Sequence, residues 1–191
     1  MRIVNLIENT KGHDRCAYAH GLSFYVETSE HKLLVDLGPS EAALHNAKEL
    51  GIDLTKVDTV VLSHGHYDHS GGIMPFVKIN PGAAIFMQET ADADYYADDG
   101  ERTEGERYRY IGIDKAIAGL PQAVKIQGDH RIDDELELFT IKERSHDLPK
   151  LVICIFCPLH QMESADDHIR LRTVFLFKRI QDTEDTVMRA A

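Results

Sequence analysis

The order of apolar and polar residues predicts short strands and short helices along the first 140 positions of the chain. Apolar residues that alternate with polar ones, or form short β-branched runs, indicate strands, whereas a spacing of three or four indicates helices. Strands are expected over residues 2–8, 22–27, 32–36, 57–62, 83–87, 123–126 and 135–141, the second and third forming a hairpin. Helices or helical turns are expected over residues 40–50, 73–79 and 111–120, the first of them capped by Ser40 and ended by Gly51.

An acidic, tyrosine-bearing stretch over residues 91–98 and a strongly charged stretch over residues 99–107 interrupt this pattern. They hold too few apolar residues to join a core, so we expect an exposed excursion beside a functional site. The rest of the pattern is that of a mixed α/β chain. Its 191 residues suffice for a single domain with a sizeable core.

The candidate chemistry lies in one loop directly after the strand that ends at residue 62, with the sequence Ser63-His64-Gly65-His66-Tyr67-Asp68-His69-Ser70-Gly71-Gly72. On an extended loop His64 and His66 point the same way, because side chains alternate with a period of two, and they can bind one metal ion. Asp68 and His69 follow where the chain turns and can face a second ion. Imidazole and carboxylate groups suit zinc, iron, manganese or nickel; the alternative is a polar loop whose histidines contact only water.

Four further segments accompany this H-x-H-x-D-H loop in the order of the chain: Glu8-Asn9-Thr10, His20-Gly21-Leu22-Ser23, Asp36-Leu37-Gly38 and Tyr110-Ile111-Gly112-Ile113. Together they resemble the metallo-β-lactamase superfamily, and in particular a branch of metal-dependent hydrolases similar to dihydropterin-(ribofuranosyl)aminobenzene-phosphate synthase. The resemblance is clear over residues 1–139. It implies an α/β (α+β) fold of the four-layer αββα sandwich type, incomplete in its C-terminal half.

The resemblance also implies an activity, metal-dependent hydrolysis. His64 and His66 would hold one ion, and Asp68 and His69 a second, with zinc, iron or manganese as the expected metals. Such ions lower the pKa of a shared water, and the resulting hydroxide attacks an ester, phosphoester or related centre of a small-molecule substrate. Asp68 is the candidate catalytic residue, because it can orient the hydroxide or take its proton.

Two residues outside the loop are candidates for supporting it. In the resembling family an aspartate at the position of Asp36 orients a ligand imidazole; the alternative is an ordinary strand-end aspartate bonded to a turn amide. The resemblance suggests that His20 lies near the pocket, with a structural role as the alternative to a chemical one. The other N-terminal histidines, which we expect at the surface, are His13, His31 and His45.

Residues 140–191 depart from the family. The family completes its site with later histidines and an acidic residue, in segments such as Gly-Cys-x-His-x-Gly that this sequence lacks. The remaining candidates are His130, His146, His160, Asp166, Asp167 and His168. A truncated or frame-shifted product would explain this, and so would a shortened branch that completes its site from a second subunit. The alternative function is therefore a non-catalytic metal-binding remnant or interaction protein.

The same departure predicts association between copies of the chain. A second sheet that lacks strands leaves apolar patches and unpaired edges exposed, so we expect a homo-oligomer with its contact near residues 151–156 or 173–177. Cys154 and Cys157 fall in this region. On a strand they face opposite sides, which favours a buried apolar role over a shared metal ion.

The composition limits the binding partners and the cellular location that we expect for the chain. The formal net charge of −11 argues against nucleic acid, which requires a basic surface. No run approaches the ~20 apolar residues of a membrane span, and no export signal is recognisable at the N-terminus. Three cysteines do not suggest a disulfide framework, so a cytoplasmic location is expected.

Overall fold

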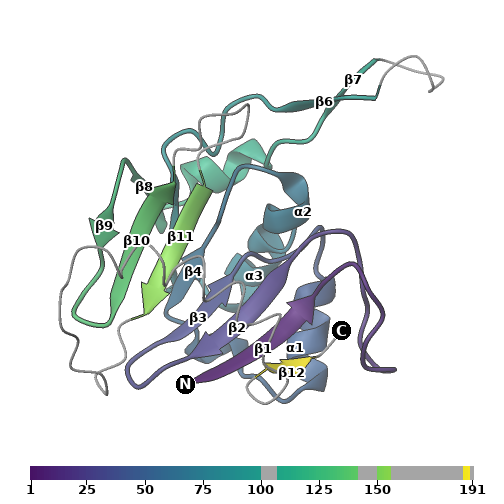
Figure 1. The fold of residues 1–191 in the computed structure, drawn as a ribbon, viewed down its shortest axis with the longest axis vertical. Coiled ribbons are helices and arrows are strands. Elements are labelled where there is room, and N and C mark those ends of the chain that lie inside the picture. Colours follow the sequence, from purple (N-terminus) through teal and green to yellow (C-terminus); the bar gives the residue numbers. More distant parts are fainter. Residues whose placement is uncertain (100–106, 142–149, 156–186, 190–191) are drawn as a thin grey trace.

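A seven-stranded sheet runs through the centre of the part of the chain that the computed structural model describes, which comprises residues 1–99, 107–141, 150–155 and 187–189 (Figure 1). The strands lie in the order β12-β1-β2-β3-β4-β5-β8. Their bounds are Arg2–Ile7 (β1), Ser23–Glu27 (β2), Lys32–Val35 (β3), Thr59–Val61 (β4), Ala84–Gln88 (β5), Ala123–Ile126 (β8) and Val187–Arg189 (β12). Strands β1, β2 and β3 pair antiparallel, with β2 and β3 in the predicted hairpin, whereas β3, β4, β5 and β8 pair parallel.

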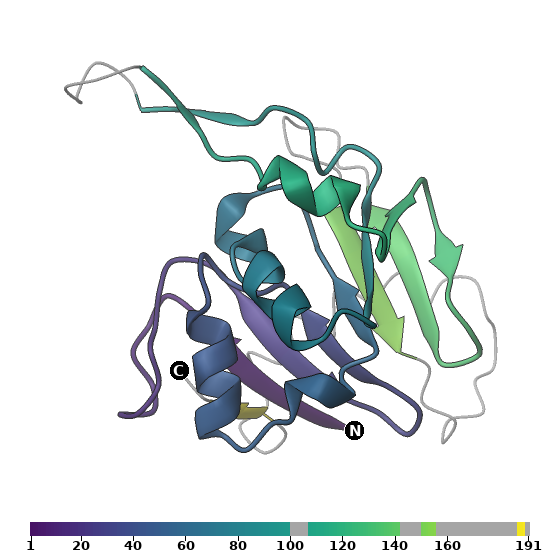
Figure 2. The same cartoon turned by 180° about the vertical axis from the view of Figure 1, so that it is seen from behind.

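Helices cover one face of this sheet (Figure 2). They are α1 (Ala42–Glu49), α2 (Tyr67–Ser70) and α3 (Ile73–Ile79), together with the 3₁₀ turns η1 (Leu54–Lys56) and η3 (Lys115–Gly119). The prediction that Ser40 caps α1 is wrong, because the N-cap position falls on Glu41. The Ser40 hydroxyl instead accepts a hydrogen bond from the Ala42 amide two residues on, at 3.3 Å, a local bond that serine commonly makes at turns. Among the described residues, no helix is long and apolar enough to cross a membrane.

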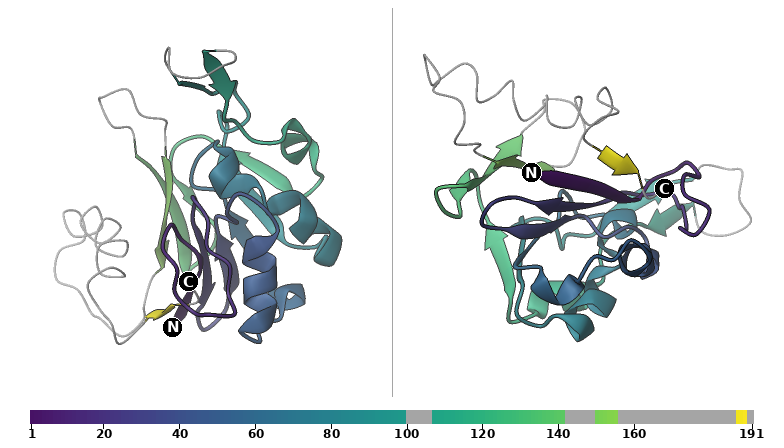
Figure 3. Two further views of the ribbon diagram at one scale, coloured as in Figure 1. Left: turned by 90° about the vertical axis from the view of Figure 1, so that its right-hand side faces the viewer. Right: turned by 90° about the horizontal axis from the view of Figure 1, so that it is seen from below.

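A smaller sheet packs on the other face (Figure 3). In the described ranges it comprises β9 (His130–Arg131), β10 (Leu136–Ile141) and β11 (Lys150–Ile155), in the order β11-β10-β9. The described residues thus form helical, large-sheet and small-sheet layers, as expected for the N-terminal part of an αββα sandwich. Residues 173–177, the second expected contact segment between copies, lie outside the described ranges.

The central strands are apolar on both faces, which explains their continuous hydrophobic sequences. Leu33 and Val61 face the small sheet, where Leu138 of β10 packs with them. Their neighbours Leu34 and Val60 face the helices instead. Successive side chains thus point to opposite faces of the sheet, and both faces are buried.

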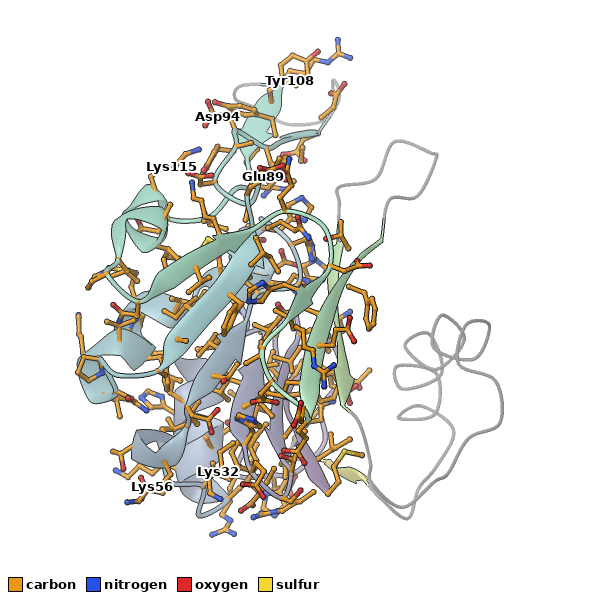
Figure 4. All side chains as sticks on the ribbon, turned by 90° about the vertical axis from the view of Figure 1, so that its left-hand side faces the viewer. Lys32, Lys56, Glu89, Asp94, Tyr108 and Lys115 are labelled. Atoms are coloured by element: carbon orange, nitrogen blue, oxygen red, sulfur yellow. The ribbon has the colours of Figure 1, made fainter. Side chains whose placement is uncertain are left out.

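The charged excursion is a hairpin of β6 (Tyr96–Asp98) and β7 (Tyr108–Tyr110) that projects from the body of the molecule (Figure 1). Tyr96 and Tyr108 are more than half exposed, which confirms that the hairpin does not join the core, whereas Ala91, at the start of the expected excursion, is buried in it. Figure 4 shows Asp94, Tyr108 and Lys115 at this end of the molecule, with Lys32 and Lys56 at the opposite end.

Candidate metal centre

The predicted metal loop begins at the carboxyl end of β4. Because β3, β4 and β5 are parallel, the segments that follow all three strands meet at this edge of the sheet. Helix α2 starts directly after His66, so Asp68 and His69 lie on a single helical turn. The aromatic ring of Tyr95, which follows β5, lies 5.8 Å from the ring of His66.

The structure brings all four predicted residues together. Nε2 of His64 lies 3.1 Å from Nδ1 of His66, and the rings of His64 and His69 are 4.2 Å apart between centroids. Oδ2 of Asp68 lies 3.6 Å from Nε2 of His69. Within the described ranges, no group of three or more His, Cys, Asp or Glu side chains is arranged so that it could hold a metal ion. The loop therefore supplies donors of suitable chemistry, and metal binding by these residues stays a prediction.

The Asp36 carboxylate supports the loop through hydrogen bonds. Its side chain is fully buried, and its backbone has a φ of 55°, a left-handed conformation that aspartate tolerates better than most residues. Oδ1 accepts the backbone N–H of Ser63 at 2.8 Å. Oδ2 accepts the Ser63 hydroxyl and Nδ1 of His69, both at 2.7 Å. The expectation that Asp36 orients an imidazole of the loop agrees with this geometry.

These bonds determine which nitrogen of the His64 and His69 imidazoles carries the proton. A carboxylate only accepts hydrogen bonds, so Nδ1 of His69 carries the proton and its Nε2 keeps a lone pair. The Ser63 hydroxyl donates its hydrogen bond to Asp36. It therefore accepts a hydrogen bond from the Nδ1–H of His64, at 2.9 Å. Asp36 thereby leaves Nε2 unprotonated on both His64 and His69, which is the form that binds a metal ion.

Electrostatics also keep His64 neutral. Burial is the main cause that lowers the pKa of His64 to about 4. Near neutral pH the imidazole is therefore uncharged, as metal ligation requires.

Glycines allow the surrounding segments to approach α2 closely. A Cβ on Gly71 would lie 2.1 Å from the carbonyl oxygen of Pro39, and a Cβ on Gly21 would lie 2.2 Å from the carbonyl oxygen of Asp68. The second contact places His20 beside the loop, with its Nε2 3.4 Å from Oδ2 of Asp68. The resemblance placed His20 near the pocket without a chemical role, and this contact confirms the position.

Other histidine candidates lie elsewhere. His13 and His45 are exposed, as expected. The surface expectation for His31 is wrong, because its half-buried ring bridges Asp58 at 2.9 Å and Asp133 at 2.6 Å. His130 packs its ring against Phe86. The candidates outside the described ranges are His146, Cys157, His160, Asp166, Asp167 and His168.

The fold and this loop define a class. Residues 19–149, more than half of the chain, match the metallo-beta-lactamase superfamily, and the chain belongs to that superfamily. The resemblance seen in the sequence is therefore confirmed.

Particular relatives refine the picture. The chain is 34% identical over 93 residues to 7,8-dihydropterin-6-methyl-4-(beta-D-ribofuranosyl)-aminobenzene-5'-phosphate synthase of Methanocaldococcus jannaschii, a match that covers 45% of this chain and 32% of that protein. It is 33% identical over 88 residues to hydroxyacylglutathione hydrolase of Serratia proteamaculans, covering 44% of this chain and 34% of that protein. The chain thus spans about a third of the length of these curated relatives.

A solved structure shares the fold. A metal-dependent hydrolase of the beta-lactamase superfamily superposes with a TM-score of 0.61 at 24% identity, covering 81% of this chain and 61% of that one.

Proposed function

We propose that this chain acts in a metal-dependent hydrolase whose centre is built on His64, His66, Asp68 and His69. The observation that carries the proposal is the buried Asp36 carboxylate. Its bonds to Ser63 and His69 leave Nε2 unprotonated on the imidazoles of His64 and His69. A loop whose histidines contacted only water would not need a fully buried carboxylate to fix their protonation.

The donor set suits zinc, iron or manganese, and the proposal assigns up to two ions to it, shared as the sequence predicts. A bound ion would lower the pKa of its water and polarise the oxygen of the bond to be cleaved. Residues of the chain would position the ligands and the attacking water. Asp36 holds His69 and, through Ser63, His64 in the ligating form. Asp68, only 12% exposed, is positioned to orient the attacking water and accept its proton.

The substrate class we propose is a small molecule with an ester, phosphoester or related bond. The names of relatives support hydrolysis: one is a hydroxyacylglutathione hydrolase, and another, from Staphylococcus aureus, is a metal-dependent hydrolase. The charge of −11 disfavours polyanionic nucleic acid as the substrate.

The test is metal-dependent hydrolysis by the purified chain. Zinc, iron or manganese is restored to chelated protein, and cleavage of a p-nitrophenyl ester and of bis(p-nitrophenyl) phosphate is followed. We expect cleavage that needs metal and is lost in His64→Ala but kept in His45→Ala, a control on the exposed face of α1. Metal binding without cleavage of either substrate would favour the alternative, a non-catalytic metal-binding protein.

A further inference from the structure

His20 places another metal-binding nitrogen beside Asp68. Its Nε2 lies 3.4 Å from Oδ2 of Asp68, and Nε2 of His69 lies 3.6 Å from the same oxygen. Zinc ligands at about 2.0–2.1 Å in a tetrahedral arrangement are about 3.3–3.4 Å from one another. These two separations are in the range for ligands that share an ion, but no three such side chains among the described residues are yet arranged to hold one.

We propose that His20 is a ligand of the second metal ion, together with Asp68 and His69. The proposal rests on the proposed function only in that a metal ion binds at this loop. It adds a ligand from the segment before β2, which the H-x-H-x-D-H pattern does not contain.

The backbone at His20 is fixed against α2. Gly21 has a φ of 133°, and its missing Cβ lets the segment press against the carbonyl of Asp68. A residue with a side chain at position 21 would push His20 away from the loop. The amide of Gly21 is also held, because it donates to Oδ1 of Asn9 at 3.1 Å.

A second anchor lies on the other side of His20. The buried side chain of Asn46, on α1, accepts the amide of Ala17 at 2.9 Å and donates to the carbonyls of Ala17 and Leu6, both at 2.7 Å. The segment is therefore held both before and after His20, while the imidazole itself is 77% exposed. A fixed backbone with an accessible side chain leaves the imidazole able to turn toward an arriving ion.

Binding would require the exposed His20 imidazole to reorient toward Asp68 and His69. Among the described residues no three donors are arranged to hold an ion, and an exposed side chain changes rotamer within picoseconds to nanoseconds. The competing explanation is a surface ion pair between His20 and Asp68, which would leave metal affinity unchanged.

The test measures zinc binding by the parent chain, by His20→Ala and by His13→Ala, a control for another exposed histidine of the same N-terminal region. Competition with a chromophoric chelator gives the stoichiometry and the Kd of each ion, and the absorption bands of cobalt report the ligands of each site. We expect two ions in the parent chain. In His20→Ala the second ion should bind at least ~10- to 100-fold more weakly. Removing a group that only hydrogen-bonds to a metal ligand already lowers metal affinity by that factor. His20→Cys should restore binding with a thiolate cobalt spectrum, and His20→Gln should not.

Two results would overturn the assignment. One is a His20→Ala chain that binds both ions with the parent's affinity and cobalt spectrum. The other is a parent chain that binds fewer than two ions. A parent chain that binds two ions with His20-dependent affinity but cleaves no test substrate would support the ligand and contradict the proposed function, so the two failures are distinguishable.

Discussion

Replacing Asp36 with asparagine should weaken metal binding and destabilise the metal-free chain. The substitution keeps the size of the side chain but replaces one acceptor oxygen with a donor. Oδ2 accepts from both the Ser63 hydroxyl and Nδ1 of His69. An amide nitrogen there would face the Nδ1–H of His69, donor against donor. His69 can relieve this conflict only by moving its proton to Nε2, the nitrogen needed by the metal ion.

The size of the expected loss of stability follows from the hydrogen bonds that the substitution removes. A hydrogen bond to a charged group contributes ~1.5–3 kcal/mol, and two such bonds reach Oδ2. Asparagine retains the acceptor for the Ser63 amide and part of the packing. We therefore expect the free energy of unfolding of the metal-free chain to fall by about 2–3 kcal/mol. Zinc affinity should fall by ~10- to 100-fold, as for other groups that orient a ligand histidine.

Urea denaturation of the metal-free chain measures the first effect and chelator competition the second. Nitrogen NMR of the histidine rings reports directly whether the proton of His69 moves to Nε2. Asp134→Asn is the matched control, since that aspartate is fully exposed and pairs only with Arg131 among the described contacts. An Asp36→Asn chain with the parent's zinc affinity and unchanged histidine shifts would refute the proposed role of the carboxylate.

Three further outcomes are expected. His64→Ala should lose zinc while the free energy of unfolding changes by about 1 kcal/mol, measured by urea denaturation; a zinc-replete variant would contradict the ligand assignment. Gly71→Ala should destabilise by about 1–3 kcal/mol, because the new Cβ meets a carbonyl oxygen at 2.1 Å, whereas Gly119→Ala, with no neighbour within 4 Å, should not. Burial lowers the pKa of His31, but hydrogen bonds to two aspartates outweigh it and raise the pKa above its ordinary value of 6.5. These bonds therefore stabilise the chain below about pH 6.5 and lose their effect as the pH rises through the raised pKa. His31→Gln should lower the melting temperature more at about pH 6 than at about pH 9, and an equal loss at both would count against this account.

Local pattern was enough to predict much of the fold. The hairpin of β2 and β3 and helix α3 lie where the alternation and spacing of apolar residues place them. The metal loop was recognisable because its residues are close in sequence. Asp36 was recognisable only through the resemblance, since 27 residues separate it from Ser63.

Contacts between distant segments left no comparable signal. His31 reaches Asp133 across 102 residues, and the pairing depends on how the small sheet packs on the large one. His20 lies beside Asp68 because a glycine lets two loops meet, which the spacing of either loop does not encode. Tertiary packing, rather than local propensity, decided both positions.

The most direct test of the metal centre is an anomalous-diffraction map of crystals of the parent chain grown with zinc. The account predicts a peak about 2.0–2.2 Å from the imidazole nitrogens of His64 and His66, and a second peak at Asp68 and His69. A map with zinc bound only at other residues, and none at this loop, would contradict it.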